Sequence, residues 1–180
     1  SLHLAFYLAS WGMYRGSSFL LQKDYKVLLP VVEEVLKPEY DCLFGVACAD
    51  LREPEVQVML TKLYDYIADY FRPIRDEVAG CEVASSVSPV LVTKILMGTL
   101  GCVPAYDRFF QDGVATHKVT TQEYSLKSVL RLVDFYEEHN DRLEETRRGM
   151  QCEDLTYPQM KVLDMGFWQV GFEKDTGSAK

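Results

Sequence analysis

Apolar residues recur at intervals of three and four along most of the chain, which is the spacing of an amphipathic helix. The clearest example covers residues 54–71, where Lys62, Asp65 and Asp69 lie opposite the apolar stripe or at its edge. Pro54 suits the first helical position, and Arg72-Pro73 is expected to end the helix. The stripe itself consists of Val56, Met59, Leu60, Leu63, Tyr64, Ile67 and Phe71.

Further helices are predicted from the same periodicity and from local boundary signals. Ser88-Pro89 is a helix-start pair, and the helix that it opens is apolar almost all round, so we expect it to be central. Pro104 is expected to open a short helix that carries Tyr106 to Phe110. Residues 81–87 are the only run with some strand character, and we interpret them as a loop. The other predicted helices span residues 2–14, 26–36, 125–148 and 158–173.

These elements predict an all-α fold with about seven or eight helices. The 180 residues are 48% hydrophobic, which is enough for one hydrophobic core. We therefore expect a single globular domain over residues 1–173 and a frayed tail over residues 174–180.

Three charged residues, Lys94, Asp107 and Arg108, interrupt the apolar run 90–110. An unpaired buried charge costs several kcal/mol, so these groups must lie at the surface, pair with each other or serve a site. Asp107 follows Lys94 past a Gly-Cys-Val-Pro turn, which allows the two to meet. Two readings stay open: a salt bridge that fixes the turn, or a catalytic pair in which Lys94 has a lowered pKa and acts as a nucleophile.

A second charge in an apolar setting is Arg15, which is followed by the hydroxyls of Ser17 and Ser18. An arginine, hydroxyls and free backbone amides together can bind a phosphate or a carboxylate. The alternative is that Ser17 caps a helix while Arg15 pairs with Asp107 or Asp164. A sharper hypothesis joins both regions in one anion site made of Arg15, Ser17, Lys94, Tyr106 and Asp107.

The net charge and the placement of the cysteines and histidines argue against several classes of protein. The net charge is −8, and its two halves carry −5 and −3, so non-specific nucleic-acid binding is disfavoured. The five cysteines form no C-x-x-C motif and the three histidines are scattered, so no metal site and no cofactor are indicated. No apolar segment is long enough to span a bilayer, and we expect a soluble cytoplasmic protein.

In the last predicted helix, Lys161 and Asp164 are expected to pair at i,i+3, and Phe167 and Trp168 to belong to the core.

The segment Lys-Ile-Leu-Met-Gly-Thr-Leu-Gly-Cys-Val-Pro-Ala-Tyr-Asp-Arg (94–108) resembles the region around the catalytic aspartate of helix-hairpin-helix DNA glycosylases. The resemblance implies that Asp107 assists departure of a base, with Arg108 as its neighbour and Lys94 as a possible nucleophile. The family's Leu-Pro-Gly-Val-Gly hairpin is replaced here by Leu-Gly-Cys-Val-Pro (100–104).

The stretches 6–18, 94–110 and 160–169 are similar to those of an uncharacterised family of bacterial all-helical proteins, a resemblance that implies no activity. Two functions are carried forward. The first is a binding or interaction module whose polar pocket, near Arg15, Lys94 and Asp107, takes a small anionic ligand or a protein partner; Ser17, Ser18, Tyr106 and Arg108 would contribute to it. The alternative is a glycosylase-type, nucleic-acid-processing enzyme with Asp107 and Lys94 as catalytic residues.

Overall fold

A computed structural model describes residues 1–177 of the chain and confirms the all-α class. Within that range there is no β-strand, only an isolated bridge between Cys152 and Leu155. The α-helices are α1 (Leu2–Ser10), α2 (Leu29–Val35), α3 (Pro54–Ala79), α4 (Pro89–Thr99), α5 (Arg108–His117), α6 (Leu126–Glu138), α7 (Asn140–Gly149) and α8 (Gln159–Gly177). Short 3-10 helices cover Phe19–Gln22, Tyr25–Leu28, Pro38–Leu43 and Ala49–Arg52.

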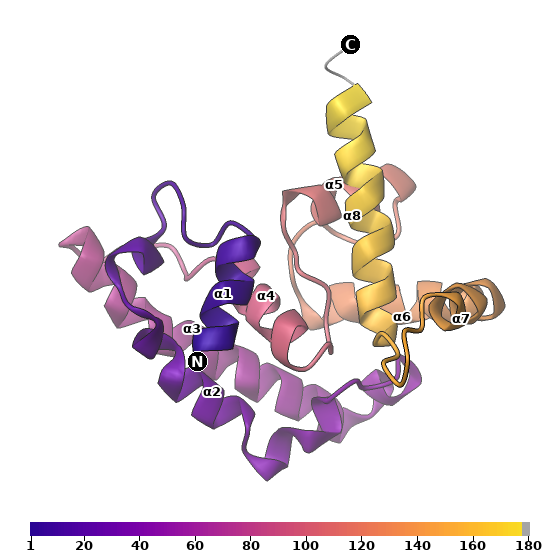
Figure 1. The fold of residues 1–180 in the computed structure, drawn as a ribbon, viewed down its shortest axis with the longest axis horizontal. Coiled ribbons are helices and arrows are strands. Elements are labelled where there is room, and N and C mark those ends of the chain that lie inside the picture. The colour runs from indigo at the N-terminus through magenta and orange to yellow at the C-terminus, as the bar shows by residue number, and fades with distance from the viewer. Residues whose placement is uncertain (178–180) are drawn as a thin grey trace.

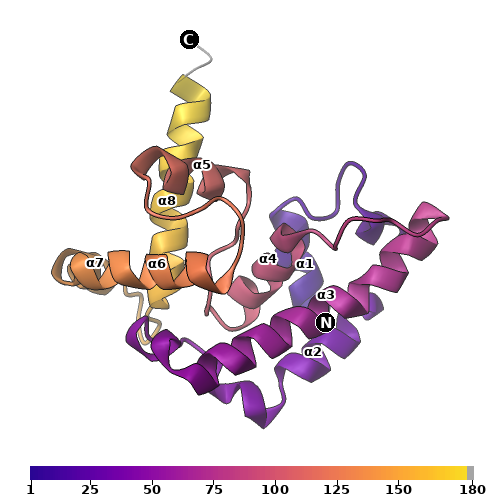
Figure 2. The ribbon, with the colours of Figure 1, turned by 180° about the vertical axis from the view of Figure 1, so that it is seen from behind.

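The ribbon has the outline of a wide V (Figure 1). Helices α1 to α4 form one arm, with the long α3 along its outer side, and α5 to α8 form the other (Figures 1 and 2). One continuous cluster of buried apolar side chains includes residues of both arms, so they share a core. The segment 100–107 between α4 and α5 crosses from one arm to the other.

Helix α4 is the central helix that the sequence predicts. It begins at Pro89, and every residue from Leu91 to Met97 is buried. Gly98 lies where α4 meets α1, because a Cβ at that position would collide with the ring of Tyr7. This close approach brings α1 and α4 together and places the Lys94 side chain next to Trp11, which follows α1.

Helix α3 passes through Pro73 and ends at Ala79, so the prediction that Arg72-Pro73 ends it is wrong. Pro73 removes one hydrogen bond to the carbonyl of Asp69. Both residues are exposed, so water can satisfy that carbonyl. The stop occurs instead at Gly80, which adopts a left-handed conformation with φ of 69°.

Three other boundaries differ from the predictions. Helix α1 ends at Ser10 rather than Tyr14, because Gly12 turns the chain with a positive φ of 73°. The predicted helix 125–148 is divided at His139 into α6 and α7, and α7 has no buried residue that would extend the apolar stripe of α6. No helix opens at Pro104, since α5 begins only at Arg108.

The last helix continues beyond the predicted end of the domain. Helix α8 includes residues 174–177, which the sequence assigns to a frayed tail, and an ion pair of 3.0 Å between Arg108 and Asp175 ties this turn to α5. The remaining three residues of the predicted tail, 178–180, lie outside the described part of the chain.

Candidate functional site

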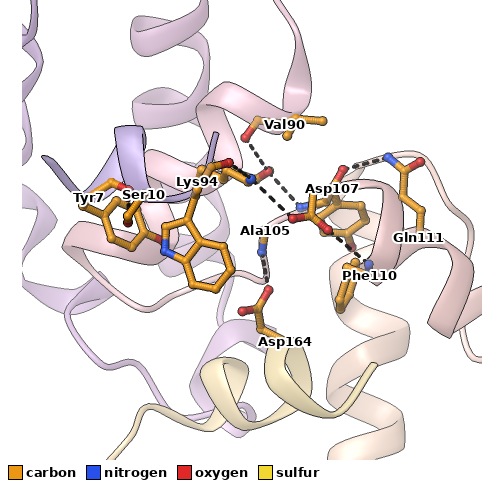
Figure 3. Close-up of polar contacts among 12 residues, drawn as sticks. Tyr7, Ser10, Val90, Lys94, Ala105, Asp107, Phe110, Gln111 and Asp164 are labelled. Atoms are coloured by element: carbon orange, nitrogen blue, oxygen red, sulfur yellow. Dashed lines mark hydrogen bonds and ion pairs between the residues drawn. The ribbon is translucent and has the colours of Figure 1, made fainter. Parts of the chain in front are cut away.

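Lys94 and Asp107 meet, as the sequence predicts. The Lys94 ammonium lies 3.3 Å from the Asp107 carboxylate and donates a 2.9 Å hydrogen bond to the carbonyl oxygen of Trp11 (Figure 3). The exposed fractions of the two side chains are only 6% and 15%. Asp107 also caps α5, because its carboxylate accepts a hydrogen bond from the backbone amide of Phe110. Both groups are therefore engaged inside the protein.

A second ion pair extends this arrangement. The predicted pair of Lys161 and Asp164 is present at 2.7 Å, and Asp164 also accepts a hydrogen bond from the amide of Ala105. The indole ring of Trp11 lies 5.7 Å from the Lys94 ammonium and 5.3 Å from that of Lys161, so both make cation–π contacts with it. We call Lys94, Asp107, Lys161 and Asp164 the charge cluster.

The charge cluster is neutral overall and largely buried. Burial raises the pKa of Asp164, while the Lys161 ammonium and the amide of Ala105 act in the opposite direction. Burial also raises the pKa of Tyr7, and the nearby Asp164 and Asp107 carboxylates add to this effect. Two cations matched by two anions in a water-poor setting are typical of a structural network, because removing one member would strand the charge of another.

Hydrogen bonds to the crossing segment hold Asp107 in place. The amide of Tyr106 donates to the hydroxyl of Thr93, one residue before Lys94. The side-chain amide of Gln111 donates to the carbonyl of Tyr106 (Figure 3). Together with the bond from Ala105 to Asp164, these contacts fix the segment between α4 and α8. The position of Asp107 therefore depends on long-range packing and not on a short helix opened by Pro104.

The side chains of Tyr106 and Arg108 do not join the charge cluster. The buried Tyr106 hydroxyl forms a 2.7 Å hydrogen bond with Ser128 on α6. The Arg108 side chain is 65% exposed and pairs with Asp175 on α8. Both residues were expected to contact a ligand beside Lys94, and the structure gives each of them a different partner.

Arg15 lies apart from the charge cluster. No ion pair joins it to Asp107 or Asp164, and within residues 1–177 it has no acidic partner. It lines a cavity of about 550 Å³ instead, which we call the Arg15 pocket. The lining residues are Gly12, Met13, Arg15, Ser17, Ser18, Phe19, Gln22, Arg75, Val78, Ala79, Ser88 and Leu91.

Several polar side chains of the Arg15 pocket have no partner in the described part of the chain. These are Arg15, Ser17, Gln22 and Ser88. Ser18 differs, because its hydroxyl donates a 2.6 Å hydrogen bond to the carbonyl of Met13. The predicted grouping of Arg15, Ser17 and Ser18 is therefore present in one place, without Lys94, Tyr106, Asp107 or Arg108.

Arg75 is the second cation of the Arg15 pocket, and its charge is already matched. Its guanidinium donates to Asp76 at 2.8 and 3.0 Å, and also to the carbonyls of Val83 and Ser85. Sequence reasoning missed Arg75 and Gln22, because only the folding of residues 12–22 against the end of α3 and the start of α4 brings them to Arg15. Ser88 carried a signal, but only as the start of a helix.

A second cavity, of about 680 Å³, lies elsewhere and was not predicted. Its walls include Tyr7, Phe44 and Tyr157, together with the cations Arg147 and Lys161. Those cations are matched by Glu144 and Asp164, each at 2.7 Å. This cavity therefore offers apolar surface but no unmatched positive charge, and the carboxylate of Asp154 also lines it.

The described residues contain no grouped metal ligands, and two of the cysteines are buried. No group of three or more His, Cys, Asp or Glu side chains is placed to hold a metal ion in residues 1–177. Burial raises the pKa of Cys48 and Cys102 to about 12, which keeps both as unreactive thiols.

Among the described helices, none combines the length and the apolar character needed to cross a bilayer.

No family model, no curated protein and no solved structure matches this chain. The two resemblances drawn from the sequence therefore stay predictions.

Proposed function

We propose that the protein is a binding module for a small anionic ligand and that the ligand occupies the Arg15 pocket. The observation that carries the proposal is the guanidinium of Arg15, which lines a cavity and has no acidic partner in residues 1–177. In a protein with a net charge of −8, an unmatched cation in a cavity is a local attraction for an anion.

The backbone supports this role for Arg15. Gly12 has a positive φ of 73°, and a Cβ built on it would lie 2.6 Å from Nε of Arg15. Glycine adopts this positive φ without strain, and its lack of a Cβ leaves space for the guanidinium to lie over the turn. The hydroxyl of Ser17 and the amide of Gln22 are available as additional hydrogen-bond groups in the same cavity.

We also place the protein in the cytoplasm. All five of its cysteines are free thiols, and Cys42, Cys81 and Cys152 are exposed. Exposed free thiols persist in a reducing compartment, which supports this placement.

A thermal-shift experiment with phosphate, sulfate, acetate and citrate tests the proposal. A ligand that binds only the folded state raises the melting temperature in proportion to the logarithm of its concentration. We expect such a rise for wild type and for Lys127→Gln, which removes an exposed positive charge from α6. We expect none for Arg15→Gln. Equal responses from Arg15→Gln and wild type would refute the proposal.

The Arg15→Gln variant is suited to this test because the exposed side chain of Arg15 makes no ion pair or hydrogen bond within residues 1–177. Its unliganded melting temperature should stay within about 2 °C of wild type, since surface substitutions usually change stability by less than ~0.5 kcal/mol. A lost response then reports lost binding and not a lost fold.

The second candidate is an enzyme of the helix-hairpin-helix glycosylase type. It is favoured by the placement of Asp107, which caps α5 with its carboxylate 3.3 Å from the Lys94 ammonium. Burial of the pair and its internal partners weigh against it. Incubation with duplexes that contain damaged bases distinguishes the two: base release by wild type that is lost in Asp107→Asn would support the enzyme.

A further inference from the structure

We infer that the ligand of the Arg15 pocket is a small organic monocarboxylate with an apolar body, an inference that rests on the proposed function. It is drawn from three features of the pocket: the number of unmatched charges, the volume, and the chemistry of the walls.

The charge of the pocket favours a single negative charge. Arg75 is already matched by Asp76, and Lys23, which follows the lining residue Gln22 in the sequence, is matched by Glu77 at 3.0 Å. Arg15 therefore supplies one unmatched positive charge. A monoanion would neutralise it, whereas a phosphate monoester would bring a further negative charge into the pocket without a second unmatched cation.

The volume of the pocket indicates a ligand that is larger than an inorganic anion. About 550 Å³ is within the usual range of small-molecule sites. An inorganic anion is only a few times larger than a water molecule, which takes up about 30 Å³ in the liquid, and would leave most of the pocket empty.

Part of the pocket lining is apolar and can contact such a body. Met13, Phe19 and Val78 are half-buried, and Leu91 forms a buried part of the lining. An alkyl or aryl chain in contact with them would remove apolar surface from water, which is favourable in proportion to the area buried. The Arg15 guanidinium can donate two parallel hydrogen bonds to a carboxylate at the other end.

Isothermal titration calorimetry with the full chain tests the inference, using acetate, butanoate, hexanoate and inorganic phosphate as probes. Each methylene that becomes buried should raise the affinity by about fourfold, at ~0.8 kcal/mol per methylene. We expect hexanoate to bind at least ~10-fold more tightly than acetate and more tightly than phosphate.

Two variants test where the carboxylate and the apolar chain of the ligand bind. Arg15→Gln should weaken hexanoate binding by ~10-fold or more, because the charge-assisted hydrogen bonds are lost, whereas Lys127→Gln should not. Val78→Thr replaces a methyl group by a hydroxyl of similar size on a half-buried wall. It should weaken hexanoate binding and leave acetate binding unchanged.

The outcomes separate this inference from the proposed function. Phosphate binding that depends on Arg15, with no gain from acetate to hexanoate, would overturn the monocarboxylate and leave an anion site at Arg15. Absence of binding by every probe would contradict both, and so would binding that is unchanged in Arg15→Gln.

Discussion

Replacing Asp107 by alanine tests whether the charge cluster holds the fold together. The Lys94 side chain is 6% exposed, so the substitution would leave a buried ammonium with the Trp11 carbonyl as its hydrogen-bond partner. Breaking a buried ion pair by removing one partner costs about 3–5 kcal/mol. The same substitution removes the cap of α5, which is by itself a loss of about 1 kcal/mol.

We therefore expect Asp107→Ala to lower the free energy of unfolding by about 3–5 kcal/mol, because the two losses overlap and Asp107 keeps some contact with solvent. Urea denaturation followed by circular dichroism measures this directly. Asp65→Ala, at an exposed position of α3 whose side chain makes no hydrogen bond or ion pair within residues 1–177, is a matched control and should change stability by less than ~0.5 kcal/mol.

A double substitution provides a sharper criterion. Lys94→Met with Asp107→Ala removes both charges, so the double variant should recover much of the stability that Asp107→Ala loses. The reasoning would be refuted if Asp107→Ala were no less stable than Asp65→Ala, or if Lys94→Met gave no recovery.

Two further predictions concern stability. Gly171→Ala should destabilise the protein by about 1–3 kcal/mol in the same denaturation assay, because the new Cβ would collide with the carbonyl oxygen of Phe109 where α5 crosses α8. Gly166→Ala is the control: this position of α8 is open, so the substitution should be neutral or stabilising. The Arg147 guanidinium and other hydrogen-bond donors lower the pKa of Glu144 from 4.5 to about 2. Its stabilisation is thus complete above pH 4.5 and is lost as the pH falls toward 2, so Glu144→Gln should flatten the pH dependence of the melting temperature in this window.

The sequence predicts well those features that depend on neighbouring residues. The start of α4 follows from Ser88-Pro89, and its central position follows from a mostly apolar run in which Lys94 is the only charged residue. The pair of Lys161 and Asp164 follows from i,i+3 spacing on one helix. These features need no knowledge of how distant segments pack.

Features that depend on packing were predicted less well. Proline at position 73 is compatible with α3 because this face of the helix is exposed, whereas the Arg72-Pro73 signal by itself predicts a stop. Tyr106 precedes Asp107 directly, yet its hydroxyl forms a hydrogen bond with Ser128 on α6. The proposed anion site was predicted as one cluster around Arg15 and Lys94, and the fold separates it into a pocket and a buried charge cluster.

A map of the backbone amides that respond to an anion in ¹H–¹⁵N NMR spectra tests most directly where the anion binds. We expect acetate or hexanoate to shift the amides of residues 12–22 and of Ser88, which border the Arg15 pocket, and to leave those of Lys94 and Asp107 unchanged. Shifts centred on Lys94 and Asp107 would contradict it, because the charge cluster would then be the binding site.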